Sequence, residues 1–363
     1  MEENNSLSPE ENTPQQPIQP TIEQNEIPQE HSPYTSGTDL SSSFSGSRID
    51  LSLINSKITH ARKEIANYLI GQHEMVDLLL IGLFSGGHIL LEGVPGIAKT
   101  LTAKVLSKTL SVDFSRIQFT PDMMPSDIIG TSIFNMKTSE FSFKKGPIFT
   151  NIVLIDEINR APAKTQAALF EVMEERQITY DGVTHKLDFP FLVIATQNPI
   201  EQEGTYRLPE AQLDRFLFKI NLNYPTLEEE MSILTRYKSG VAIDFDKIEN
   251  VFSREDLLAI QDTISQVRIE DSIIKYIAEI THSTRNHGKL YLGASPRASL
   301  SMLKAAKTMA AMRGRDFVIP DDVQYVAFHV INHRIILTPE AEMEGMTEAD
   351  LIQEIIKSVE VPR

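Results

Sequence analysis

The sequence contains no cysteine and no tryptophan among its 363 residues. Without cysteine the chain has no disulfide framework, no cysteine-based zinc site and no thiol nucleophile. Long apolar runs are also missing, and the longest stretches, such as Met75–Ser85, are too short to span a bilayer. The acidic, polar N-terminus lacks the basic start and apolar core of a signal peptide. We therefore expect a cytoplasmic protein with no membrane insertion.

Basic residues are scarce relative to acidic ones. The 34 lysines and arginines are outnumbered by 50 aspartates and glutamates, which gives a formal net charge of −16 at pH 7. The field of such a chain repels phosphate backbones, so a surface that binds duplex nucleic acid would be a local exception. The length is sufficient for one large or two medium domains with a core of their own.

Composition and periodicity divide the chain into three parts. Residues 1–48 are rich in proline, glutamate, glutamine, asparagine and serine, which predicts a disordered tail; a tail that docks on a partner is the alternative. Residues 49–225 alternate helical patterns with short buried strands, which predicts an α/β domain with a parallel sheet covered on both faces. Residues 226–363 have few strand signals and capping-box helix starts at Thr226 and Ser253, which predicts a mainly helical second domain.

The α/β part contains four strand candidates besides the one that opens its first chemical motif. Each is a short apolar run bounded by turn or polar residues. The candidates are Phe114–Phe119, Ile152–Ile155, Phe191–Ala195 and Phe216–Leu222.

The most informative segment is Gly93–Thr100, with the sequence GVPGIAKT. It follows an apolar run at His88–Leu91, which predicts a buried strand, and it precedes a helical pattern at Leu101–Leu110. A glycine-bearing turn between strand and helix, ending in Lys-Thr, is typical of a phosphate-binding loop. We expect Lys99 to neutralise the β- and γ-phosphates and the Thr100 hydroxyl to ligate Mg²⁺. An ordinary strand-to-helix turn is the alternative.

One position of this loop departs from the GxxxxGK[ST] pattern. Ala98 stands where a glycine usually precedes the lysine. Because a methyl group is small, we expect at most a weakened loop, provided that the position does not need a positive φ. The residues expected to contact nucleotide here are Gly93, Val94, Pro95, Gly96, Ile97, Ala98, Lys99, Thr100 and Leu101.

Polar residues follow two of the later strands. Asp156 and Glu157 come directly after Ile152–Ile155, at the strand end where open α/β sheets bind ligands. An aspartate there can hold the Mg²⁺ shell, and the next residue can polarise a water for attack on the γ-phosphate. Asn198 closes the polar stretch after Phe191–Ala195, where an amide can orient a water and a phosphate together. Solvated acids and a routine Asn-Pro turn are the alternatives.

Five segments, taken in order and spacing, resemble the MoxR family of AAA+ ATPases, in the helix-two insert clade. They are GVPGIAKT, LIDEINRAPAKTQAALFEVMEE, ATQNP, LPEAQLDRF and GASPRAS. The resemblance covers roughly residues 50–340, and DEINRAP and LPEAQLDRF are far more specific than a lone phosphate loop. It implies a P-loop AAA+ parallel-sheet core with a C-terminal mainly helical lid domain. Ala98 also matches the family form.

The resemblance assigns a role to each matching residue. Lys99 and Thr100 match the Walker A lysine and hydroxyl, and Asp156 and Glu157 match the Walker B metal-shell acid and catalytic base. Asn198 matches the first sensor.

Three further positions acquire roles from the resemblance. Arg215 matches the arginine finger that reaches into a neighbouring subunit, and Arg297 matches the second sensor on the lid. Ile70, Gly71 and Gln72 lie where the family places its adenine-side hinge. Without the family, Arg215 could pair with a neighbour such as Asp214, and Arg297 could be a surface arginine.

Two insertions fit the same family. Residues 120–130 together with 140–149 interrupt the sheet and resemble the helix-two insert. Residues 177–185 contain Asp181-Gly182, a good hairpin signal, where the clade carries its pre-sensor hairpin. Such inserts face a pore or a partner in ring ATPases, and simple loop decoration is the alternative.

His329 and His333 have the four-residue spacing of a two-histidine metal pair. The chain has no glutamate next to the first histidine, as HExxH requires, and no evident third ligand. We therefore expect these histidines to serve packing or an interface.

The resemblance implies Mg²⁺-dependent ATP hydrolysis by a ring of subunits, with six as the expected number. It also implies that the ring remodels or matures a partner protein. The family points to a partner with a von Willebrand factor A domain. A nucleic-acid-acting motor of the same fold is an alternative, disfavoured by the acidic balance. A nucleotide-gated scaffold with little turnover is a second, disfavoured by the presence of Glu157, Asn198 and Arg215 together.

Overall fold

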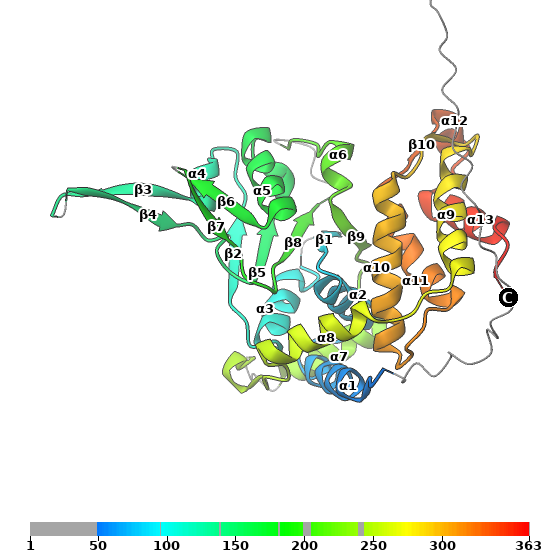
Figure 1. The fold of residues 1–363 in the computed structure, drawn as a ribbon, viewed down its shortest axis with the longest axis horizontal. Helices are drawn as coiled ribbons and strands as arrows, with labels where there is room; N and C mark the ends of the chain where they lie inside the picture. Colours follow the sequence, from blue (N-terminus) through cyan, green and yellow to red (C-terminus); the bar gives the residue numbers. More distant parts are fainter. Residues whose placement is uncertain are drawn as a thin grey trace, which may run out of the picture. The chain divides into compact units, whose positions relative to one another are not determined.

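The computed structural model describes residues 49–362 except residues 95, 138, 181, 199–204 and 239–242, and these residues belong to one compact unit (Figure 1). The predicted tail at residues 1–48, Pro95 of the phosphate loop and Asp181 of the second insertion lie outside the described residues. Among the described residues, no helix is long and apolar enough to cross a membrane.

A five-stranded parallel sheet forms the centre of the unit. Its order is β2-β5-β8-β1-β9, and every neighbouring pair is parallel. The bounds are β1 His88–Glu92, β2 Phe114–Gln118, β5 Ile152–Asp156, β8 Leu192–Gln197 and β9 Phe216–Asn221. The four strand candidates are confirmed to within two residues at each end, because each is a short apolar run with polar residues after it.

Both faces of the sheet are buried, as the apolar runs predict. Along β1, Ile89 and Leu91 join one hydrophobic cluster and Leu90 joins a second one. Side chains alternate across a strand, so the two clusters lie on opposite faces. Helices α1 (Ser52–Ala66), α2 (His73–Phe84) and α3 (Lys99–Thr109) contribute to the first cluster, and α5 (Ala163–Glu175) contributes to the second.

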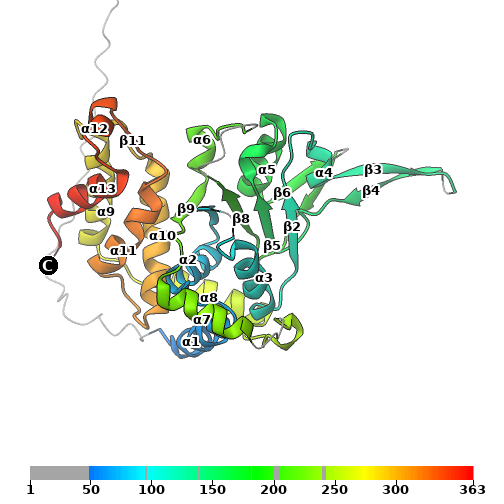
Figure 2. The ribbon, with the colours of Figure 1, turned by 180° about the vertical axis from the view of Figure 1, so that it is seen from behind.

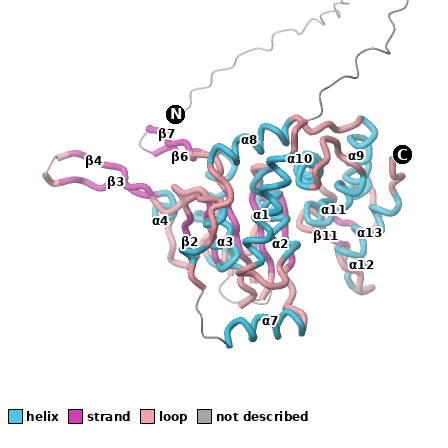
Figure 3. Tube along the Cα trace, turned by 90° about the horizontal axis from the view of Figure 1, so that it is seen from below, coloured by secondary structure: helices cyan, strands magenta, loops and turns pink. Residues whose placement is uncertain are grey.

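The two insertions form antiparallel hairpins outside the sheet. The first contains α4 (Pro125–Ile129) and a long ribbon of β3 (Gly130–Asn135) and β4 (Glu140–Lys145), which extends away from the sheet (Figure 1). The second pairs β6 (Gln177–Tyr180) with β7 (Val183–Lys186), and this confirms the predicted hairpin. Figure 3 shows both hairpins at the end of the unit opposite α9 and α13.

The C-terminal part is mainly helical, as predicted, with one addition. A short antiparallel pair, β10 (Leu290–Leu292) with β11 (Ile336–Leu337), lies among the helices. The remaining elements are η1 Ile158–Arg160, α6 Glu210–Leu213, α7 Leu227–Lys238, η2 Phe245–Lys247, α8 Arg254–Ser265, α9 Asp271–Arg285, α10 Pro296–Met312, α11 Pro320–Ile331, α12 Pro339–Met343 and α13 Glu348–Ser358. Helices α9 to α13 gather beside β9 (Figures 1 and 2).

Local sequence explains where these helices begin. Ser253 accepts a hydrogen bond from the Asp256 amide, and Asp256 accepts one from the Ser253 amide, which completes the predicted capping box of α8. Thr226 and Glu229 exchange the same pair of bonds before α7. The predicted domain boundary after residue 225 stays a prediction, because α8 packs on α2 and residues of both parts share one hydrophobic cluster.

Candidate nucleotide site

The loop Gly93–Thr100 joins the end of β1 to the first turn of α3, as the sequence predicts. Gly96 has φ +89°, a backbone conformation that glycine adopts without strain. Ala98 has φ +58° and ψ +20°, so this position does need a positive φ. The condition under which we expected alanine to fit this loop easily is therefore not met. A residue with a side chain costs about 1–2 kcal/mol in the left-handed region, so the backbone at Ala98 is strained.

Lys99 is the first residue of α3, and its Nζ donates a hydrogen bond to the Gly93 carbonyl oxygen at 2.6 Å. Burial lowers the pKa of Lys99, and the carboxylates of Asp156, Glu92 and Glu157 oppose that shift. Three acids therefore influence one half-buried ammonium at the start of a helix. The first amides of a helix have no partners within the helix and carry its positive dipole end, so this turn favours anions.

The two acids at the end of β5 are held by different groups. Asp156, buried at 8% exposure, accepts hydrogen bonds from Arg116 Nε at 2.6 Å and from Thr196 Oγ1 at 3.3 Å. The Glu157 amide donates to the same Thr196 hydroxyl at 3.0 Å, and the Glu157 side chain pairs with Arg160 at 2.5 Å. Neither Arg116 nor Arg160 stood out in the sequence as part of the site.

Asn198 directly follows β8, next to the loop. The Gly93 amide donates to the Gln197 carbonyl at 3.3 Å, and the register pairs Glu92 of β1 with Gln197. Asp156 ends the adjacent strand, whose Ile155 pairs with Ala195. The ends of β1, β5 and β8 therefore bring the loop, the acids and the amide residue to one edge of the sheet.

A cavity of about 540 Å³ opens beside the loop. Ile70 and Gln72, from the turn between α1 and α2, and Gly96, Ala98 and Leu101 line it. Its volume lies within the roughly 300–1,000 Å³ that small-molecule sites occupy, and its lining is largely apolar.

Gly71 keeps the turn between α1 and α2 in a shape that a larger residue would disturb. Its φ is +77°, and a Cβ atom at this position would lie 2.3 Å from the Glu229 carboxyl group. The predicted hinge at residues 70–72 therefore lies at the cavity, with Ile70 and Gln72 in its wall.

Arg215 and Arg297 lie together, and they line a different cavity, of about 210 Å³. Arg215 Nη2 is 3.0 Å from Glu174 Oε2, and Arg297 Nη2 is 2.6 Å from Glu174 Oε1. The ion pair of Arg215 is therefore with Glu174, and not with Asp214 as the sequence alternative supposed. Glu174 was absent from our sequence-based candidates, since nothing local in FEVMEE marks its partners.

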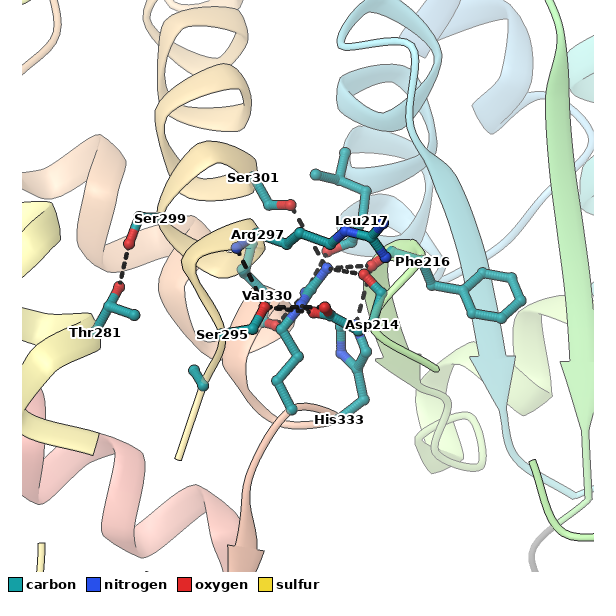
Figure 4. Close-up of polar contacts among 12 residues, drawn as sticks. Asp214, Phe216, Leu217, Thr281, Ser295, Arg297, Ser299, Ser301, Val330 and His333 are labelled. Carbon is teal, nitrogen blue, oxygen red and sulfur yellow. Dashed lines mark hydrogen bonds and ion pairs between the residues drawn. The ribbon is translucent and has the colours of Figure 1, made fainter. Parts of the chain in front are cut away.

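Asp214 instead belongs to the contact between the sheet and the C-terminal helices. Its carboxylate accepts hydrogen bonds from Ser295 Oγ, the N-cap of α10, at 2.9 and 3.0 Å (Figure 4). It also accepts one from Arg334 Nε at 2.7 Å. Arg334 is 6% exposed and also donates to the carbonyl oxygens of Asp214 and Phe216, at 2.9 and 2.6 Å. Sequence patterns did not indicate this anchor.

His329 and His333 make packing contacts. His329 Nε2 is 3.3 Å from a Glu74 carboxyl oxygen, and His333 Nε2 donates to the Phe216 carbonyl oxygen at 3.1 Å. Burial lowers the pKa of both imidazoles. Within the part of the chain that the structure describes, no cluster of three or more His, Cys, Asp or Glu side chains has a metal-binding arrangement.

This arrangement has the chemistry of phosphoryl transfer. A helix N-terminus with a lysine attracts phosphates, two acids and a hydroxyl can hold a hydrated cation and a water, and an apolar cavity can take a flat base. Arg215 and Arg297 form a second group at a different cavity.

Comparison with known proteins agrees with this chemistry. A model of the ATPase family associated with various cellular activities (AAA) matches residues 88–218, and a model of the AAA lid domain matches residues 282–355. The chain is 48% identical to the protein YeaC of Bacillus subtilis, over 83% of this chain and 94% of YeaC. It is 44% identical to the chaperone MoxR1 of Mycobacterium tuberculosis, over 83% of this chain and 81% of MoxR1.

A solved structure extends the similarity to three dimensions. A crystal structure from Cytophaga hutchinsonii superimposes with a TM-score of 0.81 at 45% identity, and the match covers 86% of this chain and 97% of the other.

Proposed function

This chain belongs to the MoxR family of AAA ATPases, and we propose that it hydrolyses ATP with Mg²⁺ at sites shared between neighbouring copies in a ring. The residues around the loop supply one half of each site. The adenine would occupy the cavity beside Ile70 and Gln72, and the phosphates would lie against the first turn of α3. Bound Mg²⁺ would supply charge neutralisation, with the Thr100 hydroxyl and Asp156 on its side of the site.

Glu157 and Asn198 act on the attacking water in this proposal. The Glu157 carboxylate accepts the proton of the water, and the Asn198 amide orients the water toward the γ-phosphate. Arg116 and Thr196 orient the neighbouring Asp156 carboxylate through their hydrogen bonds. Lys99 offsets the charge that develops on the phosphates.

The position of the two arginines is the observation that carries the shared-site proposal. Arg215 and Arg297 line a cavity different from the one beside the loop, and both side chains are partly exposed. A cation that lines another cavity of its own chain can serve a nucleotide that a second copy presents. An arginine supplied in this way contributes roughly 10³–10⁵ in rate.

We further propose that the ATPase cycle remodels a partner protein in the cytoplasm. The name of the relative MoxR1 supports a chaperone role, and family resemblance points to a partner with a von Willebrand factor A domain. The net charge of −16 argues against nucleic acid as the partner. Stimulation of hydrolysis by nucleic acid at any salt concentration would contradict this choice.

Three variants test the shared site. Lys99→Ala should lose ATP binding, and Glu157→Gln should bind ATP without hydrolysing it, because only the second keeps the phosphate contacts. Arg215→Ala should bind ATP as a subunit but fail in hydrolysis, by roughly 10³-fold or more in kcat. ATP hydrolysis and nucleotide affinity of the purified proteins are the measurements.

A mixture then separates a shared site from a site within one chain. Arg215→Ala mixed with Lys99→Ala should recover hydrolysis above either variant alone, since Lys99→Ala copies still provide Arg215 to their neighbours. Absence of recovery would reject the shared site. Complete lack of turnover in the unchanged protein at high concentration would favour a nucleotide-gated scaffold.

A further inference from the structure

The carboxylate of Glu174 joins two arginines from different parts of the fold. Arg215 directly precedes β9 of the sheet, and Arg297 lies in the first turn of α10. One carboxyl oxygen is 3.0 Å from Arg215 Nη2 and the other is 2.6 Å from Arg297 Nη2. A single side chain therefore holds an arginine beside the sheet and an arginine of the C-terminal helices in one group.

Charge explains why this group needs all three members. Two guanidinium groups that share one carboxylate lie close enough to repel each other, and the carboxylate offsets that repulsion. Glu174 is the second-last residue of α5, where a negative charge is disfavoured by the helix dipole. Arg297 is near the start of α10, where a positive charge is disfavoured. Each position is unfavourable alone and becomes favourable through the other.

The end of α5 is fixed from three sides, so Glu174 has a defined position. Arg215 Nη1 donates to the Phe170 carbonyl oxygen at 2.6 Å, and His88 Nε2 donates to the Met173 carbonyl oxygen at 3.0 Å. The guanidinium of Arg176 donates to the Gly86 carbonyl oxygen. These bonds hold the last turn of α5 against the start of β1 and the residue before β9.

His88 keeps its bond at neutral pH. Burial lowers the pKa of His88 to about 4, so the ring is neutral and carries one proton. The Val193 amide donates to Nδ1 at 3.0 Å, which places that proton on Nε2, facing Met173.

We propose that Glu174 is a positioning residue that presents Arg215 and Arg297 as a pair to the nucleotide of the neighbouring copy. The proposal rests on the shared site described above. Arginine has five N–H donors, so a carboxylate that engages one terminal nitrogen of each guanidinium leaves donors for phosphate oxygens. Because the carboxylate holds both side chains before the neighbour arrives, less conformational entropy is lost when the site forms.

Glu174→Gln tests this role with little change in shape. The amide keeps one acceptor and removes the negative charge, so the arginines repel and lose their common anchor. We expect kcat for ATP hydrolysis to fall about 10- to 100-fold, because misplacement of a catalytic group by about 1 Å has this effect. The KM for ATP and the affinity for nucleotide should stay near those of the unchanged protein, since Glu174 lies outside the loop cavity.

Glu175→Gln is the matched control, with the same charge removed from the adjacent residue of the same helix, where the side chain is exposed. It should retain full kcat. An equal loss in both variants, or an unchanged kcat in Glu174→Gln, would overturn the proposal.

Mixing separates this proposal from the shared site on which it rests. Glu174→Gln mixed with Lys99→Ala should exceed the mean activity of the two, because Lys99→Ala copies provide correctly held arginines. Recovery with Arg215→Ala but none with Glu174→Gln would overturn only the role of Glu174. Recovery with neither variant would reject the shared site itself.

Discussion

Ala98 has a left-handed backbone at the turn that leads from the phosphate loop into α3. Its φ of +58° is a conformation that glycine adopts at little cost and alanine does not. The carbonyl oxygen of Ala98 also accepts bonds from the Thr102 amide and hydroxyl, at 2.9 and 3.0 Å, which fixes the start of α3. These hydrogen bonds in the first turn of α3 therefore hold Ala98 in its strained backbone conformation.

Ala98→Gly should raise the free energy of unfolding by about 1 kcal/mol, because the strain is relieved without loss of a contact. Urea denaturation of the two proteins measures the difference. Ala103→Gly, in the middle of α3, is the control, and it should lower the free energy by about 1 kcal/mol or more. A loss of stability in Ala98→Gly would show that the backbone at this position is not strained.

Single-residue chemistry was predictable where it depends on neighbours along the chain. The loop and Asp156-Glu157 follow directly from apolar strands, so their place at the edge of the sheet could be derived from local pattern. Glu174 could not, because its partner Arg297 lies 123 positions away and only tertiary packing brings the two together. The positive φ of Ala98 was stated as a condition, and the sequence alone could not decide it.

At the level of elements, the C-terminal helices are joined to the sheet through a buried charge. Arg334 follows α11, and Asp214 lies between α6 and β9. Burial lowers the pKa of Arg334, and its bond with Asp214 opposes that shift. Removing the arginine would leave the Asp214 carboxylate, only 17% exposed, without its cationic partner, which is costly.

Arg334→Met should therefore lower the free energy of unfolding by about 3–5 kcal/mol, since Asp214 and several carbonyl oxygens lose their donor. Arg268→Met is the matched control, because Arg268 pairs with Asp316 at 3.0 Å with a side chain that is 60% exposed. That change should cost less than about 1 kcal/mol. Similar losses in the two variants, measured by urea denaturation, would contradict the anchor.

The order and type of the helices and strands were largely predictable from the sequence, whereas the contacts that connect the C-terminal helices to the sheet were not. Capping boxes and apolar periodicity depend on residues only a few positions apart, and they predicted where α7 and α8 begin. The β10–β11 pair is too short to leave a pattern, and Arg334 looks like any arginine near a helix end.

On the scale of the whole molecule, the proposed shared site would make ATP hydrolysis depend on the association of copies. If Arg215 acts on a neighbour, a separated copy has a loop and acids but lacks the Arg215 that a second copy would supply to its nucleotide. ATP turnover per copy should then rise with protein concentration and level off where rings are complete. Light scattering on the same samples gives the assembly state. Constant turnover per copy over a range in which scattering shows isolated copies would contradict the prediction.

The β3–β4 hairpin extends away from the sheet and contacts the β6–β7 hairpin (Figure 1). Phe143 of β4 stacks on His185 and lies against Tyr180, with ring centres 4.9 and 5.0 Å apart, so the two hairpins are in contact although they are separate insertions in the sequence. The β6–β7 hairpin begins at Gln177, and only Arg176 separates it from Glu175 at the end of α5. A force on the exposed end of the β3–β4 hairpin, for example at Phe141, would therefore act close to the helix end that carries Glu174. If the proposed partner protein binds this hairpin, its binding and ATP hydrolysis in the neighbouring copy would be coupled through the end of α5.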